Sequence, residues 1–208
     1  MTPVRVEAKQ ISKMYNRRTI FKEISFSLAH HDTLAIIGSN GAGKSTLSKI
    51  IAGIISATTG SLEYYVDDRK TDIEEFKHHI GFVSPYLNLY DEFTAKENLE
   101  ILSSIGSLFS LANGTINESL DRVGLLSRKN DLVSTYSSGM KQRLKYAFAL
   151  IHTPALLILD EPTSNLDENG ITIVREIVRQ QKDRGALIVA TNDADEAQWC
   201  EKSIHVGN

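Results

Sequence analysis

The fold is decided by the nine residues Gly38-Ser39-Asn40-Gly41-Ala42-Gly43-Lys44-Ser45-Thr46. They fit the pattern G-x-x-x-x-G-K-[ST], whose glycines let a loop turn tightly and aim backbone N–H groups at phosphate oxygens. Residues 33–37 before the loop are an apolar run typical of a buried strand, and residues 47–51 continue as a helix. A strand, a glycine loop and a helix N-terminus in this order predict a phosphate-binding site.

Two side chains of this loop have defined chemistry at such a site. Lys44 is expected to reach the β- and γ-phosphates of a nucleotide, and the Ser45 hydroxyl is expected to bind Mg²⁺. The alternative is a Gly-rich turn that arose by chance. The strand and the helix on either side of the loop argue against that alternative.

A second apolar strand, over residues 156–159, ends in the two carboxylates Asp160 and Glu161. Because a buried strand does not tolerate charge inside it, the two acids mark the point where the strand leaves the core. Asp160 is placed to hold Mg²⁺, directly or through water, and Glu161 to polarise a water that attacks the γ-phosphate. The alternative is that both acids only cap the next turn, and the phosphate loop upstream disfavours it.

The composition is that of a globular protein. The 208 residues are 41% hydrophobic and 24% charged, and the net charge of −3 argues against nucleic acid as the main partner. Cys200 is the single cysteine, which excludes an internal disulfide and fits a reducing compartment. No apolar run is long enough to span a bilayer, and no histidine has partners at zinc spacing. Mg²⁺ is therefore the only metal expected.

Strand and helix patterns alternate at both ends of the chain. Alternating apolar residues in 4–8 and 24–28 predict two antiparallel strands near the N-terminus. Further strands are predicted over residues 61–66, 80–83, 156–160, 186–190 and 203–206, and helices over 73–79, 171–181 and 194–200. This alternation predicts an α/β fold with a mostly parallel core sheet and ligands at the carboxyl ends of its strands.

From about Tyr90 to His152 the strand patterns stop. Residues 94–97, Thr-Ala-Lys-Glu, fit a capping box, and helical spacing resumes over 117–123 and 140–151 after a turn expected at Asn113-Gly114. We therefore expect a single nucleotide-binding domain over residues 1–208. It would consist of a core lobe, residues 1–89 and 153–208, and a mainly helical subdomain, residues 90–152.

A signature-like loop precedes the last of these helices, with the sequence Tyr136-Ser137-Ser138-Gly139-Met140-Lys141-Gln142-Arg143. It resembles the LSGGQ loop of ATP-binding cassette (ABC) nucleotide-binding domains, and with the phosphate loop and the paired acids it makes nearly the whole chain similar to that family. The resemblance implies that Ser137 and Gly139 bind the γ-phosphate of an ATP molecule held by a second, facing domain. An N-capped helix without a ligand is the alternative.

The resemblance covers two further features. Residues 164–167, Ser-Asn-Leu-Asp, match the D-loop that touches the opposite domain, and Tyr15 matches the aromatic residue that stacks on adenine. Plain packing is the alternative for Tyr15. The resemblance thus implies ATP and Mg²⁺ as ligands and pairing as a homodimer, or as a heterodimer with another ABC domain. Ser138 and Met140 depart from the signature pattern, and only Met140 removes a polar contact.

Two family switches look altered. Aligning residues 81–85 with the Q-loop puts Pro85 where glutamine is usual, and proline has no side-chain oxygen for Mg²⁺ or water; a shifted alignment offers Asn88 instead. Asn192 stands where most members carry histidine, and asparagine can donate a hydrogen bond to the γ-phosphate but cannot carry positive charge. We therefore expect an ATPase that is slow in isolation. The catalytic residues expected are Lys44, Glu161 and Asn192.

The main functional hypothesis is an ATP-hydrolysing subunit that powers a membrane transporter. It would be cytoplasmic and bound to the inner face of the membrane through a transmembrane permease subunit. The alternative is a soluble ABC-type ATPase that acts in cofactor assembly or regulation, and co-purification with a polytopic membrane protein discriminates between the two. A nucleotide-binding module without catalysis draws some support from Pro85 and Asn192. Selectivity would reside in the permease, and export is slightly favoured over import.

Overall fold

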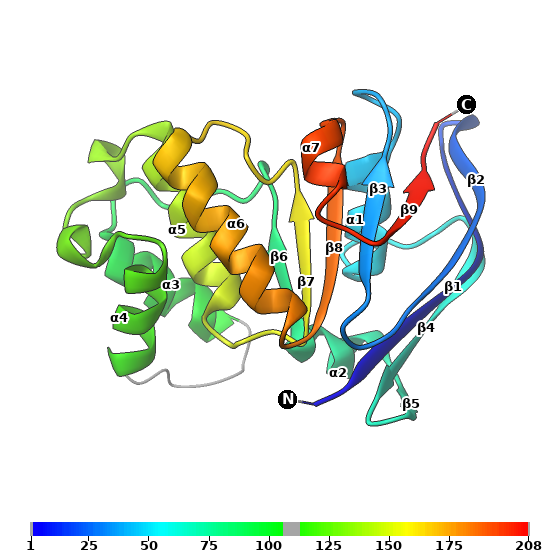
Figure 1. The fold of residues 1–208 in the computed structure, drawn as a ribbon, viewed down its shortest axis with the longest axis horizontal. Helices are drawn as coiled ribbons and strands as arrows, with labels where there is room; N and C mark the ends of the chain where they lie inside the picture. The colour runs from blue at the N-terminus through cyan, green and yellow to red at the C-terminus, as the bar shows by residue number, and fades with distance from the viewer. Residues whose placement is uncertain (1, 106–112, 208) are drawn as a thin grey trace.

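The computed structural model describes residues 2–105 and 113–207 (Figure 1). A parallel sheet stands in the middle of the molecule, between an antiparallel sheet on one side and a group of helices on the other (Figure 1). The parallel sheet has the strand order β6-β7-β8-β3-β9, and all its pairings are parallel. The predicted α/β fold with a mostly parallel core sheet is therefore confirmed. Its strands are β3 (Thr33–Ile37), β6 (Ile80–Val83), β7 (Leu156–Asp160), β8 (Ala186–Thr191) and β9 (Lys202–His205).

The register of the parallel sheet places three strand ends together. Asp160 is level with Ala190, and Ile37 is level with Thr191. The segments that follow β3, β7 and β8 therefore leave the sheet at the same edge. This edge carries the phosphate loop, the paired acids and Asn192, as expected for ligand sites at the carboxyl ends of parallel strands.

The antiparallel sheet has the strand order β2-β1-β4-β5. The alternating apolar residues near the N-terminus form the predicted antiparallel pair, with Val6 opposite Leu28 and Ala8 opposite Phe26. The three-residue strand β5 was not predicted, because its sequence Arg-Lys-Thr has no apolar alternation. The four strands are β1 (Val4–Tyr15), β2 (Arg18–Leu28), β4 (Thr59–Val66) and β5 (Arg69–Thr71).

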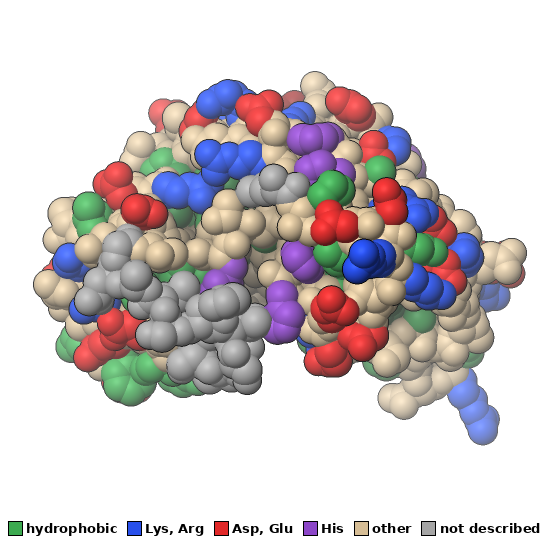
Figure 2. Space-filling view, turned by 90° about the horizontal axis from the view of Figure 1, so that it is seen from below, with side chains coloured by type: hydrophobic (Ala, Val, Ile, Leu, Met, Phe, Trp, Pro, Cys, Tyr) green, Lys and Arg blue, Asp and Glu red, His purple; other side chains and the backbone are tan. Residues whose placement is uncertain are grey.

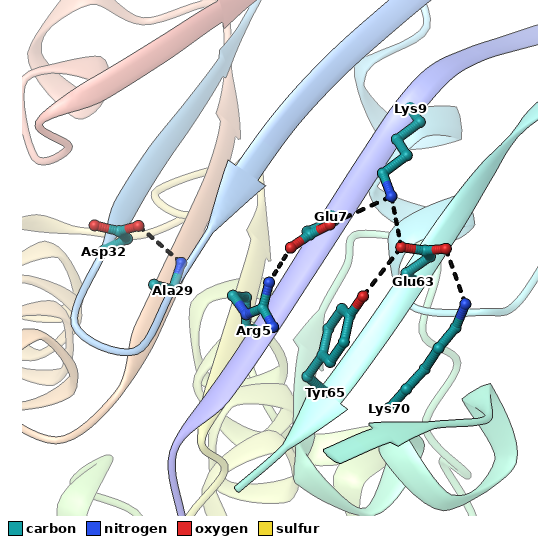
Figure 3. Close-up of polar contacts among 8 residues, drawn as sticks. All are labelled: Arg5, Glu7, Lys9, Ala29, Asp32, Glu63, Tyr65 and Lys70. Atoms are coloured by element: carbon teal, nitrogen blue, oxygen red, sulfur yellow. Dashed lines mark hydrogen bonds and ion pairs between the residues drawn. The ribbon is translucent and has the colours of Figure 1, made fainter. Parts of the chain in front are cut away.

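The outer face of this sheet carries a polar network centred on Glu63 (Figure 3). Its carboxylate accepts hydrogen bonds from Lys9 at 2.7 Å, Lys70 at 2.8 Å and Tyr65 at 3.1 Å. The bonds from Lys70, Lys9 and Tyr65 lower the pKa of Glu63 to about 2. Because the three donors come from β1, β4 and β5, the network joins neighbouring strands side by side.

The helix that begins at Ala95 is capped at its N-terminus as the sequence predicted. Thr94 and Glu97 form the predicted capping box, with Thr94 N donating to Glu97 at 2.8 Å and Glu97 N donating to Thr94 Oγ1 at 3.1 Å. The helices are α1 (Lys44–Ile51), α2 (Ile73–Phe76), α3 (Ala95–Ile105), α4 (Asn113–Arg122), α5 (Ser138–Leu150), α6 (Glu168–Lys182) and α7 (Ala194–Ala197), with the 3₁₀ turns η1 (Lys77–His79), η2 (Leu126–Arg128) and η3 (Val133–Thr135).

Two expectations about helix ends were wrong. Asn113-Gly114 is not a turn but the start of α4. The helix expected over residues 194–200 ends at Ala197. The chain turns there and returns to the sheet as β9.

Two apolar clusters use opposite faces of the parallel sheet. Leu156 and Ile158 of β7 belong to the cluster that includes β1, β3 and α1, whereas Leu157 and Leu159 belong to the cluster that includes α5 and α6. Alternate residues of a strand point to opposite faces, so one five-residue strand serves both clusters. With both faces covered, β7 and β8 are buried throughout, which explains their continuous apolar runs.

Candidate nucleotide site

A pocket of about 670 Å³ opens at the carboxyl edge of the parallel sheet. This volume lies in the range of small-molecule sites. Its wall combines the phosphate loop with the end of β1, the start of β2 and the segments that follow β6, β7 and β8. The lining residues are Tyr15, Ile20, Asn40, Gly41, Gly43, Lys44, Ser45, Thr46, Pro85, Tyr86, Glu161, Ser164 and Asn192.

The phosphate loop ends at the N-terminus of α1, whose cap residue is Gly43. Gly43 has φ +107, and a Cβ at this position would lie 2.5 Å from Ile20 Cγ2. Gly38, at the start of the loop, is equally constrained, because a Cβ there would lie 2.3 Å from Val206 O. No side chain caps α1, so its first N–H groups remain available to an anion. Gly38, Ser39 and Ala42 belong to this loop but do not line the pocket.

Lys44 is buried, with an exposed fraction of 5%, although it carries a charge. Its Nζ donates to Gly38 O at 3.0 Å and to Ser39 O at 3.3 Å, and lies 3.2 Å from Glu161 Oε1. The ammonium group is therefore held against the loop carbonyls and one carboxylate. An incoming phosphate could take over these charge-assisted contacts without a large movement of the side chain.

Ser45 and Asp160 form a polar pair at the bottom of the site. Ser45 Oγ donates to Asp160 Oδ1 at 3.0 Å, while Asp160 Oδ2 is buried and has no hydrogen-bond partner within the described residues. Burial raises the pKa of Asp160, against the opposing effect of the Ser45 hydrogen bond. A carboxylate oxygen buried without a partner beside a hydroxyl fits a divalent cation that takes its other ligands from phosphate and water.

Glu161 leaves the sheet through an unusual backbone conformation. Its φ of +51 lies in the left-handed region, and its N–H donates to Ala190 O at 2.9 Å. This turn separates the side chain of Glu161 from that of Asp160. Asp160 stays in the buried floor, while Glu161 borders the pocket beside Lys44.

Tyr15 lies at the rim of the pocket with 46% of its surface exposed. The Nζ of Lys13 is 4.7 Å from the ring centroid of Tyr15 and donates to Ser56 O at 2.6 Å. The phosphate loop thus has an accessible aromatic ring next to it. A flat, apolar ring at this position suits the face of a purine base.

Pro85 and Asn192, the two altered switch positions, also border the pocket. Lys145 Nζ of α5 donates to Pro85 O at 2.8 Å, so the backbone of this joint is tied to the helix that follows the signature-like loop. Burial lowers the pKa of Lys145. The side chain of Asn192 is exposed at the end of β8 and free to meet a ligand phosphate.

Ser137 and Gly139 do not line this pocket. Ser137 is the exposed N-cap of α5, and its Oγ accepts from Met140 N at 3.2 Å. The helix begins at Ser138, two residues earlier than expected, so Gly139 lies in its first turn. A single copy of the chain therefore does not bring the signature-like loop and the phosphate loop into one site.

Sequence patterns did not identify two side chains around the site, Tyr86 and Glu196. Tyr86 is 67% exposed and its ring lies 4.4 Å from Lys49 Nζ, but it belongs to no motif. Ser164 lines the pocket from the segment predicted to face another domain. Glu196 is buried behind the site and bonds to Thr163 and Thr191. These residues lie near the site because strands that are distant in sequence end next to one another, and the local sequence does not reveal this.

Histidines gather near the centre of the face shown in Figure 2, where acidic and basic side chains are interspersed. Burial, with a smaller contribution from the charge of His78, lowers the pKa of His152. Among the residues that the structure describes, no group of three or more His, Cys, Asp or Glu side chains could hold a metal ion. In residues 2–105 and 113–207, no helix is both long and apolar enough to cross a bilayer.

Comparison with known families gives one match in sequence, to the family described as ABC transporter, over residues 21–164. The linearmycin resistance ATP-binding protein LnrL of Bacillus subtilis is 36% identical over 193 residues, which cover 90% of this chain and 60% of that protein. The lantibiotic transport ATP-binding protein SrtF of Streptococcus pyogenes is 35% identical, covering 90% and 79%. The Nod factor export ATP-binding protein I of Rhizobium leguminosarum bv. viciae is 34% identical, covering 92% and 62%.

Solved structures give the same assignment. A dimeric ATP-binding cassette in a post-hydrolysis state with bound ADP and Pi has a TM-score of 0.84 and 27% identity, covering 97% of this chain and 94% of that one. The ATP-binding subunit of an ABC transporter has a TM-score of 0.82 and 25% identity, covering 97% and 85%. The fold is therefore that of an ABC nucleotide-binding domain.

Proposed function

The chain belongs to the ABC transporter family of ATP-binding proteins, and we propose that it binds and hydrolyses ATP to power transport through a membrane partner. The observation that carries this proposal is the meeting of Lys44, Ser45 and the Asp160-Glu161 pair at one pocket. Cation, hydroxyl and carboxylates in this arrangement are the groups that phosphoryl transfer requires.

Binding begins with the phosphates at the N-terminus of α1. The loop N–H groups and the dipole of α1 attract the negatively charged triphosphate. Lys44 then exchanges its ion pair with Glu161 for contacts with the phosphate oxygens. The adenine ring stacks on Tyr15, and Ser45 with Asp160 holds Mg²⁺. Mg²⁺, when bound, neutralises charge on the β- and γ-phosphates.

Hydrolysis then uses the freed carboxylate of Glu161. Glu161 accepts a proton from a water molecule whose oxygen bonds to the γ-phosphorus, and the bond from that phosphorus to the bridging oxygen breaks, leaving ADP and inorganic phosphate. Asn192 donates a hydrogen bond to the γ-phosphate as its charge shifts. Because Asn192 has no positive charge and Pro85 has no side-chain oxygen, we expect slow turnover of the isolated protein.

A second copy completes the site. Ser137 is exposed and Gly139 is half-buried at the N-terminus of α5, and neither lines the pocket of its own chain. We infer that they cover the γ-phosphate bound by the facing copy, with residues 164–167 at the same interface. Two ATP molecules would then close the pair, and hydrolysis would let it open.

The membrane partner would dock beside the nucleotide pocket. A groove of about 470 Å³ between α1, β6 and α5 is lined partly by the exposed apolar side chains of Ile54 and Tyr86, at 56% and 67%. Tyr86 also lines the nucleotide pocket, so one residue borders both cavities. A permease segment seated here would hold the chain at the inner face of the membrane and receive its movement. In this arrangement residues 90–152 act as a helical subdomain on a core lobe of residues 1–89 and 153–208.

The names of the relatives favour export. They refer to linearmycin resistance, lantibiotic transport and Nod factor export, and this chain spans 60% of the length of the first of them. We therefore propose an exporter, whose substrate is selected by the permease. Affinity purification of the tagged chain from native membranes, with identification of any polytopic membrane protein that it retains, tests the partnership. Retention of the permease by the wild type, and its release by Tyr86→Ala together with Ile54→Ala, supports it, whereas no retention by the wild type overturns it.

A further inference from the structure

Glu196 is a buried carboxylate that the mechanism above does not use. Its residue is 5% exposed, and in the described part of the chain no lysine, arginine or histidine forms an ion pair with it. A carboxylate removed from water without a cation is costly unless hydrogen bonds compensate it. The donors that provide this compensation indicate what the residue does.

All three donors come from the two segments that leave β7 and β8. Thr163 donates twice to Glu196 Oε1, from its backbone N–H at 3.1 Å and from its hydroxyl. The Thr191 hydroxyl donates to Glu196 Oε2, and Thr191 Oγ1 in turn accepts from Asp193 N at 2.9 Å. One carboxylate therefore bridges two segments that lie 28 positions apart in the sequence, at Thr163 and Thr191.

Both bridged loops carry residues of the pocket wall. Glu161 lies two positions before Thr163, and Asn192 directly follows Thr191. The first loop is strained, because Glu161 and Asn165 have φ of +51 and +62 without being glycine. Strained backbone persists only where surrounding contacts fix it, and Glu196 bonds to the middle of this segment.

We propose that Glu196 is a positioning residue that sets Glu161 and Asn192 at a fixed separation across the nucleotide pocket. It touches no ligand, and it acts through Thr163 and Thr191. The proposal rests on the proposed ATPase function, because the geometry it fixes matters to a reaction at Glu161. Its expected signature is a loss of turnover with little loss of nucleotide affinity, since Lys44 and the phosphate loop are not bonded to Glu196.

The test compares kcat and KM for ATP in the wild type, Glu196→Ala, Glu196→Gln and Thr191→Val. Misplacing a catalytic group by about 1 Å can cost about a hundredfold in rate, so we expect Glu196→Ala to lower kcat tenfold to about a hundredfold while KM changes less than about threefold. Glu196→Gln keeps an acceptor for Thr163 and should recover part of kcat. Thr191→Val breaks only one side of the bridge and should fall in between. Asp195→Asn, an exposed acid on the same short helix, is the matched control and should match the wild type.

Hydrogen exchange supplies a readout that does not depend on turnover. Faster exchange of Glu196→Ala in residues 161–166 and 191–193, with wild-type exchange in α1 and β3, supports the positioning role. Unchanged exchange in both loops, or an apparent kcat that falls only in proportion to the folded fraction, overturns it. If the wild type itself has no turnover with ATP and Mg²⁺, the proposed ATPase function fails, and the exchange data still decide whether Glu196 holds the two loops.

Discussion

The Nζ of Lys44 lies 3.2 Å from Oε1 of Glu161, and both residues line the nucleotide pocket. The same two groups are expected to serve the nucleotide separately, Lys44 as a cation for phosphate and Glu161 as a base for water. The ion pair therefore keeps both groups occupied until ATP separates them. Binding and activation of the base become a single event, because the phosphate that takes Lys44 also frees Glu161.

Replacing Glu161 by glutamine separates these roles. Glu161→Gln should reduce phosphate release by about a hundredfold or more, because the general base is lost. ATP should bind at least as tightly as to the wild type, and up to about fivefold tighter, since Lys44 loses a partly exposed ion pair that competes with phosphate. Steady-state phosphate release and titration with a fluorescent ATP analogue check the two parts. Glu201→Gln, an exposed acid away from the pocket, is the control, and equal rates for wild type and Glu161→Gln would remove Glu161 from the mechanism.

Restoring an imidazole at the end of β8 should accelerate the reaction. Asn192→His places a group that can be cationic at the edge of the pocket, and a charge-assisted donor at the transferring phosphate is expected to raise kcat by about tenfold. Nucleotide affinity should change little. The control Asn130→His lies at an exposed turn outside the pocket. If Asn192→His is no faster than the wild type, the missing imidazole does not limit the rate.

The ionised side chain of Asp160 should lower the stability of the folded protein when no ligand is bound. The same side chain should be required for binding of ATP with Mg²⁺. Burial raises the pKa of Asp160 above its ordinary value of 3.8, so the ionised form is penalised in the folded state at neutral pH. Asp160→Asn should therefore raise the Tm of the protein in EDTA by about 2–4 °C, the effect of about 1 kcal/mol in a domain of this size. The gain should shrink as the pH falls through the raised pKa of folded Asp160 and vanish below 3.8, where the carboxyl is protonated in both states. A lower Tm for the variant in EDTA at neutral pH would contradict this account of the buried oxygen.

Adding ATP with Mg²⁺ should reverse the order of the two proteins. The wild type should gain Tm on addition of both ligands, because binding to the folded state alone stabilises it. Asp160→Asn should gain much less, since it lacks the charge that holds the cation beside Ser45. Equal ligand-induced shifts for the two proteins would show that Asp160 is not a Mg²⁺ ligand.

The thiol of Cys200 should react very slowly with alkylating agents in the native protein. Burial raises the pKa of its thiol from 9.0 to about 12, and the side chain packs against the cluster that contains α5 and α6. Iodoacetamide at pH 8 should label the native protein at least about a hundredfold more slowly than the protein in denaturant, because thiolate is the reactive form. Above pH 9 the thiol ionises in the unfolded chain but not in the folded one, so stability should fall as the pH rises toward 12. Fast native labelling would contradict the burial of Cys200.

The sequence was most informative where one residue type has one physical use. Three glycines, a lysine and a hydroxyl between an apolar strand and a helix predicted the phosphate loop, because few other structures need that order. The acids that follow residues 156–159 lie at the end of β7 as predicted, but only Glu161 leaves the strand, because Asp160 is the last residue of β7 and is fully buried. Their exact partners, Ser45 for Asp160 and Lys44 for Glu161, emerged only with the fold.

Features that depend on contacts distant in sequence were missed. The strand β5 exists because β4 offers it an edge, not because Arg69-Lys70-Thr71 favours a strand. In the sequence Glu196 has the pattern of an ordinary polar helix residue. It is buried because the segments that follow β7 and β8 leave the sheet next to each other. Asn113-Gly114 has the local chemistry of a turn, yet its backbone is helical. For β5 and Glu196, a tertiary contact outweighed the local preference.

The central claim is that one ATP molecule is bound by the phosphate loop of one copy and by Ser137 of another. Mixing two inactive variants tests it directly, because Lys44→Ala keeps an intact Ser137 and Ser137→Arg keeps an intact Lys44. In an equal mixture half of the pairs are mixed and each contains one intact site, so ATP hydrolysis should recover to about a quarter of the wild-type rate. Full activity of Ser137→Arg alone, or a mixture no more active than its two components, would contradict the shared site.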